Sequence, residues 1–532
     1  MEDGNAGRKA TLVLVANLAG AGLGYAALLL IGRYFAPAAF GSYLFAVSVA
    51  GLAALVSNLG LGVAHQRHIA QGVEPGRALG VLVRIRLAFA VILLALLGIA
   101  YFLSTEVLGR PFTDATTPAV FAVALGIQVL SGIRQVTFDT WQGLQQVNRI
   151  ETVRLLDTLL TLVLIGNAAL LLAHLGNRLE VVPGIGAFWA DRLGWDALPG
   201  AGEAALLLSG CYHVAKAITL AFTLAWSARD RIRVAAWDAP LARSYLRLAL
   251  PFALTGTLVL VLQYTDTVLL GFFWTAREVG LYGAAQKLSS VCLLGATAVG
   301  TVLFPRFARL QAAGDRAAVA ATLASAERYL LLLVVPVAAA MAALPAQGLH
   351  VAVGDGYLDA APALRLMAVW AVVATLGQAL SSWTMAGDLP VLVRATAINA
   401  AGNVVLNVLL IPPAALGLGP AGAALATVLS TLAGYAYLRH HAHRRHGTPW
   451  MSGAQLRILA AGAVAAGFWV GAARMLPASA FDRVWELLAW GAAGVLLYAV
   501  VLVVLRELHS RDLDFLRKVA HPRALLAELR GR

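Results

Sequence analysis

Long apolar stretches recur along the whole chain, and short polar or basic stretches separate them. A helix of about 20 apolar residues crosses a hydrocarbon core roughly 30 Å thick, so each stretch predicts a membrane-spanning helix. The pattern predicts fourteen spans: Thr11–Ile31, Gly41–Val63, Leu79–Leu103, Pro118–Phe138, Val153–Leu175, Ala204–Trp226, Leu248–Trp274, Leu281–Phe304, Tyr329–Leu349, Ala363–Ala386, Val391–Ile411, Ala421–Leu438, Leu456–Met475 and Val484–Leu505.

The composition agrees with an all-α polytopic membrane protein. Of the 532 residues, 60% are hydrophobic and 13% are charged, and the mean hydropathy is +0.78. A soluble protein of several packed domains is less apolar than this. The first apolar run is too long for a cleaved signal peptide, so we interpret it as a permanent span.

The net charge of +13 reflects where the basic residues lie along the chain. If both termini and the loops after even-numbered spans share one face, that face holds 30 of the 40 Lys and Arg residues and the other face holds eight. Basic residues are enriched on the cytoplasmic side, which predicts a protein of the cell membrane with both termini in the cytoplasm. The basic tail Arg506–Arg532 suits a helix on the anionic inner leaflet, so we expect membrane lipids, and not nucleic acid, as partners.

The two halves of the chain resemble each other at a constant offset. LLIGRYFAPAAFGSYLFA, from Leu29, aligns without gaps on VLLGFFWTAREVGLYGAA, from Val268. The offset of 239 matches Gly32 with Gly271, Gly41 with Gly280 and Tyr43 with Tyr282, and an offset of 240 matches Arg154 and Asn167 with Arg394 and Asn407. Because six spans separate the repeats, two six-helix halves of equal orientation are expected around a central cavity. The predicted domains are residues 1–228, residues 229–447, two additional spans in 448–506 and a basic cytoplasmic tail, 507–532.

Several charged residues fall inside the apolar stretches. Lys216, Asp266 and Lys287 lie in the sixth, seventh and eighth predicted spans. A charge at membrane depth costs roughly 2.5–3.5 kcal/mol on insertion scales, so such residues usually face a bundle interior or a wet cavity. The repeat counterparts of Asp266 and Lys287 are the uncharged Ala27 and Ser48, so these two charges are specific to the second half.

Several common functional motifs are absent from the sequence. It has no G-x-x-x-x-G-K-[ST] phosphate loop, no H-E-x-x-H and no paired C-x-x-C, so neither ATP hydrolysis by that route nor a cofactor is expected. Arginines interleave the histidines between His440 and His446 and would repel a metal ion. Cys211 and Cys292 lie in predicted spans and are interpreted as packing residues. The longest outer loop, Gly176–Glu203, carries tryptophans typical of an interfacial helix.

Four segments carry a resemblance to a known family: GRYFAPAAFGSYLFAVSVAGLAALVSNLGLGVAHQRHIA, TDTVLLGFFWTAREVGLYGAAQKL, LFPRFARL and NAAGNVVLNVLLIPPAALGLGPAGAALATVLS. In this order and spacing they resemble the polysaccharide transporter family of the multidrug/oligosaccharidyl-lipid/polysaccharide flippase superfamily. The resemblance covers nearly the whole chain. It implies a secondary transporter, not an enzyme, that flips a polyprenyl-(pyro)phosphate-linked oligosaccharide from the inner to the outer leaflet by alternating access, for surface polysaccharide or glycan assembly. Glycan-assembly enzymes would be further partners.

An anionic substrate phosphate in such a cavity needs cations, for which the candidates are Arg154, Lys216, Lys287 and Arg394. Arg154 and Arg394 lie near cytoplasmic helix ends, so the alternative is that they extend to the membrane surface. Sugar hydroxyls could bind Asn399 and Asn403, which share a helix face with Asn407; hydrogen bonding between helices is the alternative. Asp157 and Asp266 either neutralise the cations or take up H⁺ or Na⁺ for coupling to an ion gradient.

Three other functions remain open from the sequence. A lipid II flippase of the same superfamily also fits fourteen spans. An ion-coupled small-molecule antiporter is less compatible, because basic residues outnumber acids within the spans. A membrane glycan polymerase or ligase would need a larger outer loop than the one of about 28 residues found here.

Overall fold

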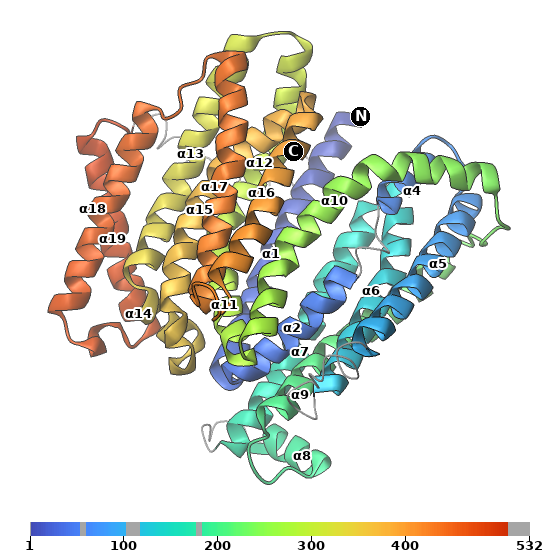
Figure 1. Cartoon of the computed structure of the whole chain (residues 1–532), viewed down its shortest axis with the longest axis horizontal. Coiled ribbons are helices and arrows are strands. Elements are labelled where there is room, and N and C mark those ends of the chain that lie inside the picture. The colour runs from blue at the N-terminus through green and yellow to red at the C-terminus, as the bar shows by residue number, and fades with distance from the viewer. Residues whose placement is uncertain (1, 54–59, 103–116, 177–182, 509–532) are drawn as a thin grey trace. The chain divides into compact units, whose positions relative to one another are not determined.

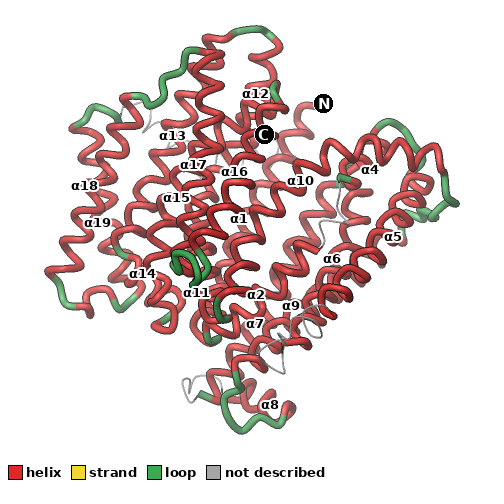
Figure 2. Tube along the Cα trace, in the orientation of Figure 1, coloured by secondary structure: helices red, strands yellow, loops and turns green. Residues whose placement is uncertain are grey.

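The computed structural model describes residues 2–53, 60–102, 117–176 and 183–508, and within these ranges the chain forms helices and no strand (Figure 1, Figure 2). Each predicted span coincides with one helix or with two consecutive helices. Eleven helices of the described chain are long and apolar enough to cross a membrane, and α2, α5 and the pair α11–α12 correspond to the other three predicted spans. The predicted all-α polytopic fold class is confirmed.

The chain divides into two compact units, one formed by Lys9–Gly280 and the other by the chain from Leu281 onward together with the first eight residues. The predicted repeats were divided near residue 228 instead. Since a compact unit and a sequence repeat need not share their limits, the predicted domain limits stay a prediction.

The N-terminal unit consists of helices joined by short connections. Their bounds are α1 (Glu2–Tyr34, whose first residues belong to the other unit), α2 (Pro37–Ala53), α4 (Leu61–Ala70), α5 (Pro75–Phe102), α6 (Thr117–Gly143), α7 (Val147–Leu175), α8 (Pro183–Leu193), α9 (Ala201–Ala228) and α10 (Ala239–Phe273). A buried cluster around Tyr245 joins α4, α5 and α10. The short helix α8 lies in the loop where an interfacial helix was predicted, and it packs on α7.

The C-terminal unit holds the remaining helices, and α11 begins just before its limit. The bounds are α11 (Ala276–Ser289), α12 (Leu294–Ala312), α13 (Arg316–Ala343), α14 (Pro345–Val353), α15 (Ala361–Gly387), α16 (Leu389–Leu410), α17 (Gly419–His446), α18 (Gly453–Met475) and α19 (Val484–Val504), with short 3₁₀ turns at Ser290–Leu293, Asp355–Ala360 and Ala478–Phe481. The two helices beyond the repeats, α18 and α19, pack on α13 through a buried cluster that includes Val335, Ile458 and Tyr498. The predicted basic tail lies outside the described residues from residue 509 onward.

Three predicted spans are not single helices, which corrects the sequence interpretation. In the second span α4 begins only at Leu61, after Gly60 at φ 71°, a left-handed conformation that glycine adopts without strain. The eighth is divided by the 3₁₀ turn Ser290–Leu293. The ninth is divided before Pro345, whose ring cannot continue the preceding helix. A hydropathy profile does not reveal these breaks, because the residues around them are apolar.

Polar side chains define where several helices begin. The Asp238 carboxylate accepts a hydrogen bond from the Leu241 N–H at 3.1 Å and pairs with Arg77 at 2.6 Å, and these two contacts hold the pKa of Asp238 below its usual value. At α18, Ser452 and Gln455 form a reciprocal capping box. These caps lie in the basic connections that precede α10 and α18.

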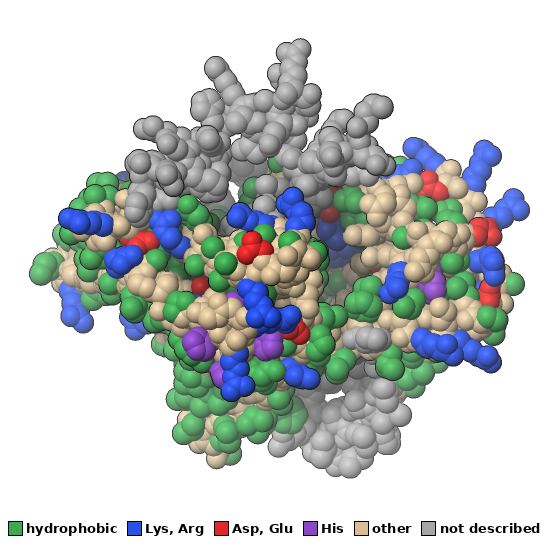
Figure 3. Space-filling model, turned by 90° about the horizontal axis from the view of Figure 1, so that it is seen from above, with side chains coloured by type: hydrophobic (Ala, Val, Ile, Leu, Met, Phe, Trp, Pro, Cys, Tyr) green, Lys and Arg blue, Asp and Glu red, His purple; other side chains and the backbone are tan. Residues whose placement is uncertain are grey.

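The loops after even-numbered spans gather at one end within each unit. In the N-terminal unit, Arg149 at the start of α7 contacts Asp230 in the α9–α10 connection at 2.7 Å, and the Ala235 N–H donates to the Gly76 carbonyl at 3.0 Å. In the C-terminal unit, Gln311 of α12 donates to the Trp383 carbonyl of α15, and Glu327 of α13 contacts Arg439 of α17. Figure 3 views this end, where Lys and Arg side chains are more plentiful than Asp and Glu. The grouping of loops on which the charge count depended is therefore present in each unit.

Labelling with a membrane-impermeant maleimide checks the orientation of this end. Both native cysteines are buried, so the wild-type chain gives a low background. In intact cells we expect Asp196→Cys, in the connection between α8 and α9, to be labelled and Arg231→Cys to be protected, because the basic end is predicted to face the cytoplasm. Both sites are exposed on loops. The opposite pattern would reverse the predicted orientation.

Two glycines matched by the sequence repeat meet face to face within the N-terminal unit. A Cβ atom built on Gly41 would lie 1.7 Å from the Ala276 carbonyl oxygen, and one built on Gly280 would lie 1.9 Å from the Pro37 carbonyl oxygen. Both obstructions are backbone atoms, which cannot rotate away as a side chain does. The first turns of α2 and α11 therefore approach each other at a distance that only glycine permits at these positions.

Candidate functional site

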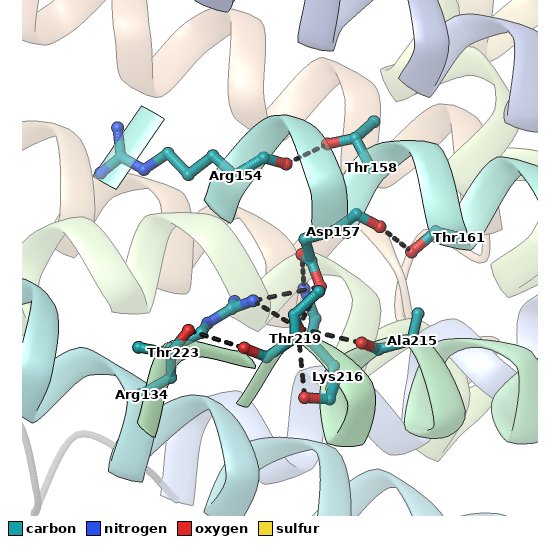
Figure 4. A network of polar contacts seen from close by, with 9 residues as sticks. All are labelled: Arg134, Arg154, Asp157, Thr158, Thr161, Ala215, Lys216, Thr219 and Thr223. Atoms are coloured by element: carbon teal, nitrogen blue, oxygen red, sulfur yellow. Dashed lines mark hydrogen bonds and ion pairs between the residues drawn. The ribbon is translucent and has the colours of Figure 1, made fainter. Parts of the chain in front are cut away.

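A cluster of three charged side chains lies between α6, α7 and α9 of the N-terminal unit (Figure 4). Asp157 of α7 pairs through one carboxylate oxygen with the Lys216 ammonium group of α9 and through the other with Arg134 Nη1 of α6, at 3.1 Å. The Thr219 hydroxyl lies 3.1 Å from the second oxygen and 3.2 Å from Arg134 Nη1. The exposed fractions of the three charged side chains are 12% for Asp157, 13% for Arg134 and 19% for Lys216.

The cluster lies deep in the helices and carries a surplus positive charge. Its three charged residues lie nine to twelve residues from the helix ends at the basic side of the unit. At a rise of 1.5 Å per residue this corresponds to a depth of about 14–18 Å, well within a hydrocarbon core. One carboxylate faces two cations there. With two cations and one carboxylate, the cluster has a formal net charge of +1.

Arg154 and Asp157 also line a cavity of about 290 Å³ between α1 and α7, together with Asn17, Glu151 and Thr158. The Arg154 guanidinium contacts the Glu151 carboxylate at 2.9 Å, and its side chain is 54% exposed. Figure 4 shows Arg154 extending away from Asp157 and Lys216. The lining of this cavity therefore includes one cation, Arg154, and two carboxylates, Glu151 and Asp157.

The other charged candidates occupy separate positions. Asp266 of α10 is 2% exposed within the N-terminal unit. Lys287 of α11 is exposed in the C-terminal unit, where its carbonyl accepts a hydrogen bond from the Ser290 hydroxyl at 2.6 Å. Arg394 of α16 is also exposed in that unit. The structure thus pairs Asp157 with Lys216, while the Arg154 side chain extends away from them, and the roles of all these candidates stay predictions.

The asparagines of α16 share one face, as their spacing predicts, but their surroundings differ. Asn403 and Asn407 are fully buried, and the Asn407 amide donates to Asn403 Oδ1 at 3.0 Å. Asn399 instead lines a cavity of about 240 Å³ between α15, α16 and α17. Asn403 therefore occupies a packed position between helices, and Asn399 alone of the three reaches a space that a ligand could enter.

Arg134 is not among the residues selected from the sequence, because the predicted limit of its helix was wrong. The fourth predicted span ended at Phe138, so Arg134 was counted with the basic residues at the helix end. The helix continues to Gly143, which places Arg134 more than two turns inside it. The signal was present, since Arg134 lies within the predicted apolar stretch.

The histidine segment of α17 is engaged in local contacts. His441 Nε2 lies 3.1 Å from the Asp388 carboxylate, which also pairs with Arg445, and His443 Nδ1 lies 2.8 Å from the Thr448 carbonyl oxygen. In the part of the chain that the structure describes, no three His, Cys, Asp or Glu side chains are grouped so as to hold a metal ion.

Known proteins share this fold over most of the chain. A lipid II flippase, MurJ, in an inward closed conformation matches 94% of this chain and 99% of its own with a TM-score of 0.67 at 15% identity. An inward-facing MATE family multidrug resistance transporter of the MOP superfamily matches 82% of this chain and 99% of its own, with a TM-score of 0.58 at 14% identity. The chain therefore shares the fold of these two membrane proteins.

Two sequence comparisons add to the likeness in fold. The model of the family described as "Polysaccharide biosynthesis protein" matches residues 195–362. A probable low-salt glycan biosynthesis flippase, Agl15, of Haloferax volcanii is 23% identical over 430 residues, which are 80% of each chain. These matches confirm the resemblance to the polysaccharide transporter flippases of the superfamily.

Proposed function

We propose that the protein is a flippase that moves a polyprenyl-(pyro)phosphate-linked oligosaccharide from the inner to the outer leaflet of the cell membrane. The observation that carries this proposal is the cluster of Arg134, Asp157 and Lys216, a surplus cation at membrane depth in a transporter fold. The likeness to a protein named as a glycan biosynthesis flippase supports the class of substrate. Such a headgroup cannot cross unaided, because its hydroxyls would lose water at a cost of a few kcal/mol each.

In this proposal the cluster binds the substrate phosphate. A phosphate oxygen approaching Lys216 competes with the Asp157 carboxylate, while Arg134 continues to neutralise that carboxylate. Arg154 at the adjacent cavity adds a planar guanidinium group suited to a second phosphate oxygen. The site therefore exchanges an internal ion pair for a substrate ion pair, which limits the cost of leaving a buried charge without a partner.

Movement across the membrane proceeds by alternating access in this proposal. Two related halves of equal orientation can open a substrate site to one leaflet and then to the other. The substrate's phosphates and sugars remain in a hydrated site, while the polyprenyl chain stays in lipid.

Coupling to an H⁺ or Na⁺ gradient belongs to the same proposal. Asp157 and Asp266 are both buried carboxylates within spans of the N-terminal unit, so either is a candidate to take up the ion. Protonation of Asp157 would release both neighbouring cations for the substrate. A protonophore or replacement of Na⁺ in the medium distinguishes the two ions by slowing translocation in one case only.

Deletion of the gene followed by a leaflet assay of the lipid-linked glycan tests the function. We expect the glycan to accumulate in the cytoplasmic leaflet, where an added impermeant glycosidase cannot reach it in intact cells, and expression of the wild-type gene to restore access. Normal translocation with an unpolymerised product at the outer face would contradict flipping and indicate the polymerase or ligase alternative.

A lipid II flippase is the second candidate. The likeness to MurJ extends over nearly the whole chain and thus includes most of the region beyond the two six-span halves. Complementation of cells depleted of their lipid II flippase separates the two substrates. The surplus of cations at Asp157 disfavours a transporter of cationic drugs.

A further inference from the structure

The cavity of about 240 Å³ in the C-terminal unit has polar walls without any charge. It lies between α15, α16 and α17, and its lining includes Trp370, Gln378, Ser381, Asn399, Thr431 and Tyr435. None of the residues that line it is Asp, Glu, Lys, Arg or His. The cavity is separate from the charged cluster on α6, α7 and α9.

Several polar groups of this cavity have no hydrogen-bond partner within the described chain. Asn399 Oδ1 is buried and has no hydrogen-bond partner among the described residues. The side chains of Gln378, Ser381 and Thr431 likewise make no hydrogen bond within the described chain. Buried polar groups normally have partners, so the buried Asn399 oxygen, beside three half-buried polar side chains that also make no hydrogen bond, indicates that water or a ligand supplies the missing partners.

Among the serines and threonines of the three helices, a missing hydrogen bond is found only at residues that line the cavity. Serine and threonine in an apolar helix usually donate to a backbone carbonyl one turn earlier. Six of the eight on α15, α16 and α17 do so, and they are Thr375, Ser382, Thr384, Thr396, Thr427 and Ser430. The two exceptions, Ser381 and Thr431, both line the cavity.

The chemistry of the walls selects the kind of occupant. A phosphate needs a cation, and a metal ion or cationic drug needs a carboxylate, and the lining provides neither. Amide and hydroxyl groups that both donate and accept suit a molecule with many hydroxyls. Trp370 and Tyr435 add flat apolar surfaces on which the C–H face of a sugar ring can pack.

We infer that this cavity binds an uncharged saccharide unit of the transported glycan, with hydrogen bonds to Gln378, Ser381, Asn399 and Thr431. The relevance of this subsite to transport rests on the proposed flippase function, whereas binding itself does not. The N-terminal unit then holds the phosphate and the C-terminal unit recognises a sugar. Selection among glycans depends on the second contact, since a phosphate is common to every lipid-linked substrate.

Filling the cavity from Gly377 tests this inference. A Cβ atom on Gly377 meets no atom within 4 Å, and the residue lines the cavity, so Gly377→Leu projects into open space without displacing the helix. Purified protein in nanodiscs is titrated with maltotriose and N,N′-diacetylchitobiose, and binding is followed by saturation-transfer difference NMR. We expect saturable binding of at least one saccharide to the wild type, loss of about tenfold or more in affinity for Gly377→Leu, and a similar loss for Asn399→Leu.

Gly467→Leu on α18 is the matched control. Its Cβ also meets no atom within 4 Å, and its position is exposed and outside the cavity, so it should bind as the wild type does. Inorganic phosphate should not displace the saccharide. Absence of binding to the wild type, equal binding by Gly377→Leu, or displacement by phosphate would each overturn the inference.

The leaflet assay separates this inference from the proposed function. If the wild-type gene fails to restore translocation, the flippase proposal is wrong whatever the saccharide titration shows. If the wild type flips the glycan and Gly377→Leu does so equally well, the flippase proposal stands and the saccharide subsite does not.

Discussion

A Lys216→Met variant is expected to fold and insert as the wild type does but to lose most of its transport. Arg134 still pairs with Asp157 at 3.1 Å after the substitution, so no buried charge loses its partner. The surplus cation that would bind phosphate is removed. A charge-assisted hydrogen bond contributes about 1.5–3 kcal/mol, so translocation in the leaflet assay should fall by about 10- to 100-fold at equal expression.

Substitution of Asp157, the acid paired with Lys216, separates a loss of transport caused by charge from a loss caused by instability. Asp157→Asn leaves Arg134 and Lys216 adjacent without a carboxylate, and removal of one partner from a buried pair typically costs about 3–5 kcal/mol. Its thermal unfolding temperature should therefore drop. The double variant Asp157→Asn, Lys216→Met should regain only part of that stability, because Arg134 still lacks a carboxylate, and it should not regain transport. Arg231→Ala, on an exposed loop, is the control for a lost cation outside the cluster. Equal transport by Lys216→Met and Arg231→Ala would remove the cluster from the substrate site.

The fold could be predicted from the sequence because its main determinant is length of apolar sequence. Membrane helices satisfy all their backbone groups internally, so an apolar stretch of sufficient length has few other structures available. The limits of the helices were less predictable. α13 begins at Arg316 and not near Tyr329, and α10 begins at Ala239 and not near Leu248, because helical hydrogen bonding continues through the amphipathic ends where hydropathy has already fallen.

The candidate site was predictable only in part for the same reason. Lys216 and Asp157 could be selected because charges within apolar stretches are costly, and the structure shows that they pair. Arg134 was not selected, because a five-residue error in a helix limit placed it near the surface. The saccharide cavity could not be predicted at all. Glutamine, serine and threonine are common in membrane helices, and only the three-dimensional structure shows which hydroxyl groups lack a hydrogen-bond partner.

Gly41→Ala is expected to destabilise the N-terminal unit by about 2–3 kcal/mol, as overpacking at a rigid contact does. The added methyl group would lie 1.7 Å from the Ala276 carbonyl oxygen and 2.7 Å from the Gly280 nitrogen, so α2 and α11 must separate. Gly280→Ala should have the same effect, because its methyl group would meet the Pro37 carbonyl oxygen at 1.9 Å. Thermal unfolding of purified protein and the fraction that stays monodisperse in detergent measure the loss.

Gly132→Ala on α6 is the control, and its expected change in stability has the opposite sign. Its Cβ meets no atom within 4 Å, so alanine should stabilise that helix by about 0.5–1 kcal/mol through its higher helix propensity. If Gly41→Ala were as stable as Gly132→Ala, the close approach of α2 and α11 would be wrong. The repeat gives a further check. Gly41 and Gly280 are equivalent positions of the two halves and obstruct each other's helix, so both substitutions act on one contact, and the double variant should be less destabilised than the sum of the two single variants.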